Sequence, residues 1–552
     1  PPDHATVAAE VPSDVRYVVV PGSVLRSHTG QQRLHLDGSS KAFVAYGRSS
    51  DVTAWLSGQR YATLRVDGQG NPLKPVVRTA PVVAGLTGGH PDPDGSDLWL
   101  DQQRSTGTLD WTVNVPSTVS LLVAADGTAP APSKITVSWP IRVSTPYATP
   151  LIVGGSVLAL LGLLLYIWAL VHLRRRRGPR RKPPARMPKM PQPPRYRPAK
   201  PELVVSSKGR RAVRRSALVA GIAAGAVLLT GCQGTAATPA ASATASTPVA
   251  ITPAAVSEQQ ATRIIGRVAG VAHRADRSRN SSLLATRFGG SAFTLRRAAY
   301  IVRKSDKKAP LPQAVPAGSA ATRLILPEAT TVWPRTLFAV VTDTSGSKLP
   351  PLAITLVQQT PREPYRVHFQ MSLRPKAKLP DLPSVTLGAN RLAPDTKLLS
   401  VPPGKLAADY GLLLRKPAVP EAKLFDTASD ELLAAVGAAA KKKAAKILGG
   451  TAKISFSDSA TDPASIVALA TANSGALVSV DLAETQTVKP GKSGVKVKPS
   501  GATKILSKTS STGKGIASTY GYQLLFSVPS AGSSDRVVLL GYAQGLISAK
   551  EL

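Results

Sequence analysis

The chain has 552 residues, of which 69 are lysine or arginine and 32 are aspartate or glutamate, so its formal net charge is +37. Its single cysteine excludes an intrachain disulfide framework and a zinc site built from several cysteines. At about 100 to 200 residues per domain, the length predicts several folded units and the segments that connect them.

Residues 1–148 form the first predicted unit, an extracytoplasmic β-rich domain. Short runs of alternating or β-branched residues are separated by Gly, Pro and Asp, which is typical of an all-β sandwich. Trp99, Trp111 and Trp139 are expected in the core or on a strand face rather than on a ligand-binding surface. The predicted strands are Val15–Val20, Ala42–Tyr46, Tyr61–Val66, Leu109–Val115, Ser120–Ala124 and Ile135–Trp139.

One loop of this domain, His90 to Asp97, gathers oxygen donors at short spacing, as hard cations prefer. It is not an EF-hand, because the glycine position and the distal glutamate are missing. Clusters of Asp, Pro and Gly are also typical of exposed turns. The sequence therefore predicts no metal site, and Asp92, Asp94 and Asp97 are the candidate ligands if a cation does bind.

A transmembrane helix is predicted within residues 149–173. Leu151–Val171 carries no charge, is long enough to cross a hydrocarbon core of ~30 Å, and has Tyr166 and Trp168 near one end. Arg174 to Arg177 follow at once, and the excess of positive charge in cytoplasmic loops assigns this end to the cytoplasm. The first domain is therefore expected outside the cell.

Residues 174–215 are expected to form a basic, proline-rich cytoplasmic linker. They hold 17 basic side chains and one acidic side chain, Glu202, and their prolines exclude regular helix or sheet over most of the stretch. Attraction to anionic lipids, at ~1 kcal/mol per basic residue near the surface, explains this composition. A proline-dependent protein partner is the alternative. Nucleic acid is not an expected partner, because only Tyr196 could stack on a base.

Residues 216–232 form a second apolar segment, which leads from the cytoplasm back to the exterior. Its end, Leu229 to Cys232, reads Leu-Thr-Gly-Cys and resembles the lipobox of bacterial lipoproteins. The resemblance implies a lipid on the sulfur of Cys232 and cleavage before it, which would give two products. The alternative is an ordinary second transmembrane helix with an incidental cysteine. Either way, residues 233–256 are an Ala-, Thr- and Pro-rich tether outside the membrane.

Residues 257–400 and 401–552 are predicted to be tandem α+β units, each with helices before a curved sheet. This order is similar to that of nuclear-transport-factor-2-like and cystatin-like domains. Residues 484–515 are expected to be a mobile loop. The predicted helices are Ser257–Asp276, 405–415 and 427–448, and the predicted strands are Arg297–Arg303, Leu337–Thr342, Ala353–Gln358, Tyr365–Ser372, Ala452–Ser457, Ala476–Leu482, Tyr522–Val528 and Arg536–Ala543.

Motifs that would indicate an enzyme are missing from the C-terminal part. His273 and His368 are its only histidines, so neither a thiol-histidine dyad nor a zincin histidine pair is expected there. Ser511 to Lys514 has the Ser and Lys spacing of penicillin-interacting enzymes, but the accompanying Lys-Thr-Gly is absent. No catalytic residue and no cofactor are predicted, and a pair of carboxylates acting on a glycan stays open.

Lysines are concentrated in the C-terminal part, and four of them are the candidate residues for an anionic partner: Lys441, Lys442, Lys443 and Lys446 on a predicted helix. A cationic surface attracts anionic lipids and wall polymers, with screening beyond ~8 Å at physiological salt. The alternative is a solvated face that only keeps the domain soluble.

The Ala-, Val-, Arg- and Pro-rich composition, the outer domain that ends in Trp139-Pro140 before a span, and the internal Leu-Thr-Gly-Cys resemble uncharacterised cell-envelope membrane proteins of actinobacteria. The resemblance is one of architecture and brings no catalytic residues. We therefore expect a protein of the cell membrane with both large domains outside the cytoplasm. It would be a non-enzymatic binding or scaffold module for an anionic wall polymer or another envelope protein. The alternative is an accessory enzyme of wall or glycan metabolism that uses carboxylate chemistry.

Overall fold

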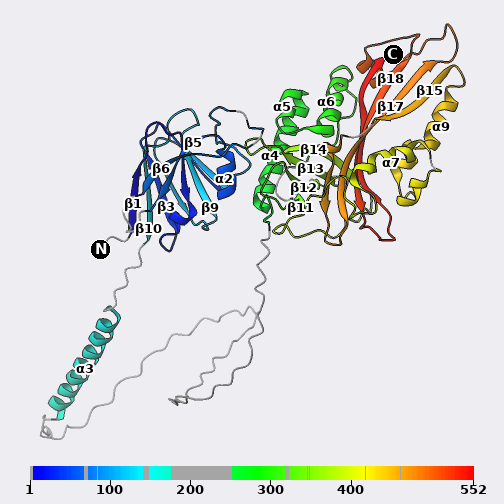
Figure 1. The fold of residues 1–552 in the computed structure, drawn as a ribbon. Coiled ribbons are helices and arrows are strands. Elements are labelled where there is room, and N and C mark those ends of the chain that lie inside the picture. Colours follow the sequence, from blue (N-terminus) through cyan, green and yellow to red (C-terminus); the bar gives the residue numbers. More distant parts are fainter. Residues whose placement is uncertain are drawn as a thin grey trace, which may run out of the picture. The chain divides into compact units, whose positions relative to one another are not determined.

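The computed structural model describes residues 4–66, 73–83, 85–86, 88–140, 148–175, 252–317, 322–344, 346, 348–416, 418–459 and 462–552 (Figure 1). The chain divides into two compact units, one made of Pro1–Val143 with Ala250–Leu552 and one made of Ser144–Val249. The first unit contains an N-terminal domain, residues 4–140, and a C-terminal region, residues 252–552.

The N-terminal domain is built from two sheets, and every strand predicted for it is confirmed to within two residues at either end. The smaller sheet has the order β1 (His4–Glu10), β10 (Lys134–Pro140), β3 (Gln32–Asp37) and β8 (Leu109–Val113). The larger has the order β6 (Lys74–Thr79), β5 (Arg60–Arg65), β2 (Tyr17–Pro21), β9 (Val119–Ala124), β4 (Lys41–Arg48) and β7 (Asp101–Thr106).

The two sheets share one core, in which Leu34 and Val137 of the smaller sheet meet Val44 and Val123 of the larger. Alternation of apolar and polar residues along the strands turns one face of each sheet inward. Trp139 is buried in this core and donates from its Nε1 to the Leu25 carbonyl at 2.6 Å. Two short helices, α1 (Gly22–Leu25) and α2 (Ser49–Trp55), lie between strands.

A second apolar cluster lies on the other face of the larger sheet. Trp55 of α2 and Trp99 are fully buried in it, with their ring centroids 5.5 Å apart. The Trp99 Nε1 donates to the Pro93 carbonyl at 2.6 Å. All three tryptophans are placed as predicted: Trp99 and Trp139 are core residues, and Trp111 lies on strand β8, half-buried against the first core.

The first predicted membrane segment is a single helix, α3 (Ala148–Arg175). Its stretch Pro150–Arg175 has 26 residues, is long and apolar enough to cross a membrane, and buries none of its side chains within the protein. The predicted basic linker beyond Arg175, the second apolar segment with Cys232, and most of the tether lie outside the described residues.

The C-terminal region is α+β, with one nine-stranded antiparallel sheet. The strands run in the order β11 (Thr322–Pro327), β12 (Arg335–Val341), β13 (Leu352–Gln358), β14 (Arg366–Leu373), β19 (Val538–Glu551), β18 (Ile516–Val528), β17 (Ala476–Pro490) and β15 (Ala452–Ser459), and β16 (Val467–Ala470) also pairs with β17. The helices are α4 (Glu258–Ser278), α5 (Ser281–Ala285), α6 (Gly290–Ser305), α7 (Pro403–Arg415), α8 (Glu431–Val436), α9 (Ala438–Ile447) and α10 (Gly501–Ser507).

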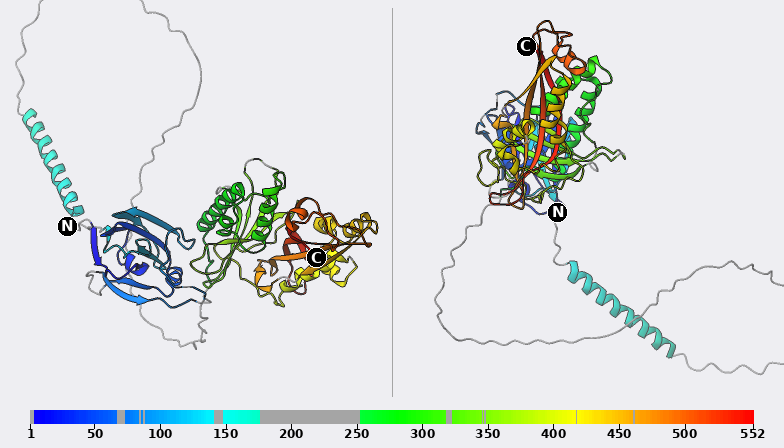
Figure 2. Two further views of the ribbon diagram at one scale, coloured as in Figure 1. Left: turned by 90° about the horizontal axis from the view of Figure 1, so that it is seen from above. Right: turned by 90° about the vertical axis from the view of Figure 1, so that its right-hand side faces the viewer.

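The two halves of this region repeat one order, helices followed by an antiparallel meander, and they meet through their last strands, β14 and β19. In Figures 1 and 2 the green helices α4–α6 cover the first half and the yellow helices α7–α9 the second. The inner faces share a core that includes Phe369 of β14 and Leu477 of β17. A hydrogen bond of 2.9 Å joins the hydroxyls of Thr355 and Ser479 across that interior, so the sheet folds back on itself.

Helix α4 begins where the sequence predicts, because Ser257 and Gln260 form a capping box. The strand predicted at Arg297–Arg303 is wrong, since these residues belong to α6. Among their buried members, Ala298 and Val302 lie on the same side of the helix as Leu295, whereas Tyr300 turns toward Asp276 of α4. A short β-branched run is compatible with a strand and with a buried helix segment. Here the helical spacing of apolar residues along Gly290–Ser305 favours the helix.

The loop predicted at 484–515 is also wrong over much of its length. Strand β17 continues to Pro490 because it pairs with β15 on one side and β18 on the other. Helix α10 follows, and a bridge joins Val497 to Thr512. A loop was predicted because this stretch is rich in lysine and glycine. Pairing with the neighbouring strands stabilises a strand there instead.

Candidate functional site

The join between the two half-sheets is short. Strands β14 and β19 pair only at Ser372↔Tyr542 and Leu373↔Gly541, and one further bond of 2.9 Å runs from the Arg374 amide to the Leu540 carbonyl. We call this join the seam. Toward Gln370 and Gln544 the strands separate, and a cavity of about 1180 Å³ opens beside them.

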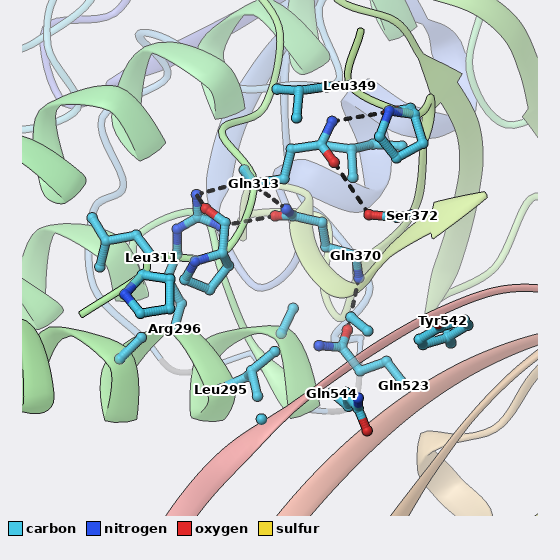
Figure 3. Close-up of a pocket in the computed structure, with 18 of the residues that line it drawn as sticks. Leu295, Arg296, Leu311, Gln313, Leu349, Gln370, Ser372, Gln523, Tyr542 and Gln544 are labelled. Carbon is cyan, nitrogen blue, oxygen red and sulfur yellow. Dashed lines mark hydrogen bonds between the residues drawn. The ribbon is translucent and has the colours of Figure 1, made fainter. Parts of the chain in front are cut away.

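The walls of this seam cavity are mostly apolar (Figure 3). One wall is the face of α6 that carries Leu295 and Val302, and another comprises the loops around Leu311 and Leu349. Gly545 of β19 lies directly beneath α6, where an added Cβ would come within 2.8 Å of the Leu295 side chain. The absence of a side chain at this glycine therefore lets the helix approach the strand.

Amide groups form the floor of the cavity. The backbone N–H of Gln370 donates to the Oε1 of Gln523 at 2.7 Å, so a side chain from β18 occupies a position where a regular ladder would place a strand (Figure 3). The Gln370 side chain donates to the Gln313 carbonyl at 2.7 Å, and Ser372 donates to the Gln313 Oε1 at 3.1 Å. Gln370 and Gln523 are both buried.

A buried arginine supports this floor from behind. The guanidinium of Arg296 donates to the Gln370 Oε1 at 3.0 Å and grips both carboxylate oxygens of Asp276, at 2.8 and 2.9 Å. The Tyr300 hydroxyl also donates to Asp276, at 2.6 Å, and burial raises the pKa of this tyrosine. Because Arg296, Gln313 and Gln523 all bond Gln370, the orientation of Gln370 is set before any ligand arrives.

The apolar walls and the amide floor of this cavity are chemically suited to an extended chain that carries amide groups. Glutamine side chains both donate and accept hydrogen bonds, as peptide groups do. Among the described residues that line the cavity, Tyr542 is the one aromatic residue, so the stacking surface that they offer a sugar ring is small.

The four lysines proposed for an anionic partner divide into two groups. Lys442, Lys443 and Lys446 of α9 are exposed. Lys441 instead points inward, donates to the Leu414 carbonyl at 2.9 Å and forms an ion pair with the buried Glu484. Lys441 is therefore occupied within the protein, and the surface open to a partner narrows to the other three.

Two carboxylates stand side by side under α9. Asp458 and Glu484 are register partners on β15 and β17, which is the closest match to the carboxylate pair left open by the sequence. Arg415 holds Asp458 at 2.8 Å, Lys441 holds Glu484, and burial raises the pKa of Glu484. Both carboxylates are thus engaged by cations within the fold.

The candidate metal ligands separate in the same way. Asp94 pairs with Arg104 at 2.6 Å, and Asp92 accepts from the Asp94 amide at 3.0 Å. Asp97 is buried and turns away from the loop toward Arg287. Among the described residues, no three His, Cys, Asp or Glu side chains are grouped closely enough to hold a metal ion. In this structure the carboxylates of Asp94 and Asp97 bind arginines.

Neither the seam nor its glutamines were identified from the sequence. Gln370 and Gln523 are separated by 153 residues, and only the strand order brings them together. The local signal was weak: Gln370 is the one polar residue among the buried positions of β14, and Gln523 directly precedes the apolar run Leu524–Phe526 of β18. Cys232, the predicted lipidation site, lies outside the described residues.

One family of proteins matches the chain. Its sequence model, described as "Domain of unknown function (DUF8094)", matches residues 252–551, which is more than half of the chain. Comparison with curated proteins and with solved structures finds no match. The matched range covers both halves of the nine-stranded sheet and their helices, so the seam lies inside the family's domain.

Proposed function

We propose that this chain, which belongs to the DUF8094 family, is a membrane-anchored extracytoplasmic protein that binds a partner in the cell envelope without transforming it. The observation that carries the proposal is the seam cavity, with its apolar walls and its floor of fixed amides. A concave site of this kind holds a ligand by shape and a few placed polar groups. The ligand we propose is an extended, uncharged peptide segment of another envelope protein.

The anchor would be α3. Arg174 and Arg175 end this helix, and the positive-inside tendency assigns that end to the cytoplasm. The N-terminal domain would then be outside. The apolar segment 216–232 would return the chain to the exterior, either as a second span or as a lipoprotein signal with a lipid on Cys232. The helix-then-meander order of each half of the C-terminal region supports nuclear-transport-factor-2-like or cystatin-like units.

A second contact is proposed at α9. The exposed Lys442, Lys443 and Lys446 project from a helix with no acidic residue, and they would attract an anionic wall polymer or lipid headgroups. Substitution of all three by Glu should abolish salt-sensitive co-sedimentation with isolated wall polymer. The same change at Lys489, Lys492 and Lys496, which carries equal charge, should leave it intact. Equal loss in both variants would indicate attraction to net charge alone.

The seam cavity is tested with a defined probe, a short fluorescent peptide of alternating Leu and Ala with blocked ends. The full-length protein in detergent should bind it, and Leu349→Asp at the rim should weaken binding by about ten-fold, or about 1.4 kcal/mol. Leu398→Asp is the matched control, because Leu398 is 66% exposed and Leu349 is 52% exposed, and only Leu349 lines the cavity. Equal binding by both variants would exclude the cavity.

The enzyme alternative makes the opposite prediction. If the chain is an accessory enzyme, wall glycan incubated with it should be shortened, and Asp458→Asn or Glu484→Gln should stop that turnover. We expect no turnover, because Arg415 and Lys441 already engage these two carboxylates.

A further inference from the structure

The N-terminal domain and the C-terminal region are joined by buried charges. Asp97, at 0% exposure, accepts from the Arg287 guanidinium at 2.5 and 3.2 Å. It also accepts from Arg267 at 3.0 Å and from the Tyr365 backbone amide at 2.9 Å. All four bonds come from the C-terminal region, across 170 to 268 residues of chain.

A second buried pair repeats the pattern. Asp51 of α2 and Arg335 of β12 are only 2% and 1% exposed, and their charged groups are 2.7 Å apart. The Arg335 guanidinium lies 3.6 Å above the Trp333 ring, and Trp333 packs against the cluster around Trp55 and Trp99. Apolar contact therefore surrounds the ion pair and excludes water from it.

Main-chain carbonyls of the N-terminal domain complete the contact. Gln260 of α4 donates to the Leu98 carbonyl at 2.9 Å, and Arg263 donates to the Leu100 carbonyl at 3.0 Å. Arg362 donates to the Trp55 carbonyl at 2.9 Å, and burial lowers the pKa of Arg263 and of Arg362. We call this whole contact the interdomain interface.

The interface is complementary in charge. The N-terminal domain contributes two carboxylates and a set of carbonyl oxygens, and the C-terminal region contributes five arginines: Arg263, Arg267, Arg287, Arg335 and Arg362. A buried charge without its partner costs several kcal/mol. Each surface is therefore specific for the other, and a shift of register would leave several charges unpaired.

We infer that the N-terminal domain and the C-terminal region form a non-covalent complex that does not need the chain between them. Two consequences follow. Both parts must lie on the same side of the membrane, although α3 lies between them in the sequence. If the chain is cut at Cys232, the two products stay together as one particle. The partner of this arginine surface is thus a β-rich domain that presents Asp51 and Asp97.

The complex is tested on the full chain, with a protease site inserted in the tether between residues 240 and 248 and an affinity tag at the N-terminus. After cutting in detergent, the C-terminal product should be retained with the tagged product. Asp97→Lys should weaken retention by at least about 100-fold, because a buried ion pair becomes a repulsion. Release of the wild-type C-terminal product on cutting would overturn the inference.

A matched control is available three residues away. Asp94 pairs with Arg104 inside its own domain, so Asp94→Lys makes the same charge change without touching the interface. It should leave retention unchanged. If Asp97→Lys fails to fold, Asp97→Asn keeps the size of the side chain and removes its charge, and it should still weaken retention by at least about ten-fold. Equal release by Asp94→Lys and Asp97→Lys would contradict the assignment of Asp97.

A separate experiment determines on which side of the membrane each part lies. Single cysteines are introduced at the exposed positions Ser40 and Ser534 in a Cys232→Ala background. A membrane-impermeant maleimide on intact cells should label both. Labelling of neither would keep the interface and overturn the proposed extracytoplasmic function. Labelling of one without the other would overturn the interface itself.

Discussion

The two helical layers of the C-terminal region are held in different ways. Helix α4 buries eight side chains, among them Ile264, Ile265 and Val268, and begins with a capping box. None of residues 438–447, all of which the structure describes, is buried in α9. Lys441 attaches that helix through Glu484, the Leu414 carbonyl and a contact of 5.2 Å with the Phe456 ring.

Both halves of the C-terminal region place helices before strands, but their helical layers differ in how they are held to the sheet. The first layer buries a continuous apolar face and supports both the interdomain interface and the seam cavity. The α9 end of the second layer buries none of its alanines or Ile447, exposes Lys442, Lys443 and Lys446, and is attached through Lys441. The stability contributed by apolar packing is spread over the whole buried face of a helix. The stability contributed by one ion pair can be removed by one substitution.

The largest effect is expected where the first layer contains a buried charge. Arg296→Met leaves Asp276 without its guanidinium and should lower the free energy of unfolding by about 3–5 kcal/mol. Urea unfolding followed by circular dichroism measures the change. Arg297→Met is the control, because Arg297 is the exposed neighbour on α6 and should cost less than about 0.5 kcal/mol.

Shortening one isoleucine in each layer to alanine compares how much packing in the two layers contributes to stability. Ile264→Ala in α4 should cost about 2–4 kcal/mol, because the residue is fully buried. Ile447→Ala in α9 should cost almost nothing, because Ile447 is 76% exposed. Similar losses for the two isoleucines, measured by the same unfolding experiment, would remove the distinction between the layers.

A pH effect is expected from His368 of β14, beneath the first layer. His368 packs under Gly289 and Gly290 at the start of α6, and burial lowers its pKa to about 4. The unfolded chain takes up this proton near pH 6.5, so stability should fall as the pH drops from about 6.5 to 4, by at most about 1.4 kcal/mol per unit. Thermal unfolding of His368→Gln should show a shallower slope over that window, and an unchanged slope would contradict the assignment.

The smallest effect is expected in the second layer and should be local. Lys441→Met removes the charged contact of α9. Burial already raises the pKa of Glu484, so this carboxyl can take up a proton once the lysine is gone, and stability should fall by only about 1 kcal/mol while hydrogen exchange in residues 438–447 accelerates. Lys442→Met on the same helix should change neither, since Lys442 is exposed. Exchange that accelerates throughout the sheet after Lys441→Met would show that α9 is integral to the core.

Sequence reasoning succeeded where the determinants were local. Alternation located the N-terminal strands, and the capping residues Ser257 and Gln260 located α4. It failed at Arg297–Arg303, where a short β-branched run inside a helix has the composition of a strand. In each of these cases the deciding information lay within about twenty residues.

The site required information that no local pattern holds. Asp97 was considered as a metal ligand because its neighbours are oxygen-rich, but its partner Arg287 is 190 residues away. Lys441 looked like its neighbours Lys442 and Lys443 until the pairing of β15 with β17 placed Glu484 beneath it. Long-range strand order therefore decided which charges face solvent and which are paired.

The seam has a consequence for the order in which the protein matures. Strand β14 is complete at Leu373, but its neighbour β19 begins only at Val538. At roughly 5–20 residues per second, a ribosome needs on the order of ten seconds to make the intervening chain. During that interval the edge of β14 stays open, and an open edge is a template for wrong pairing. A nascent chain paused between these strands is therefore the stage most in need of a chaperone.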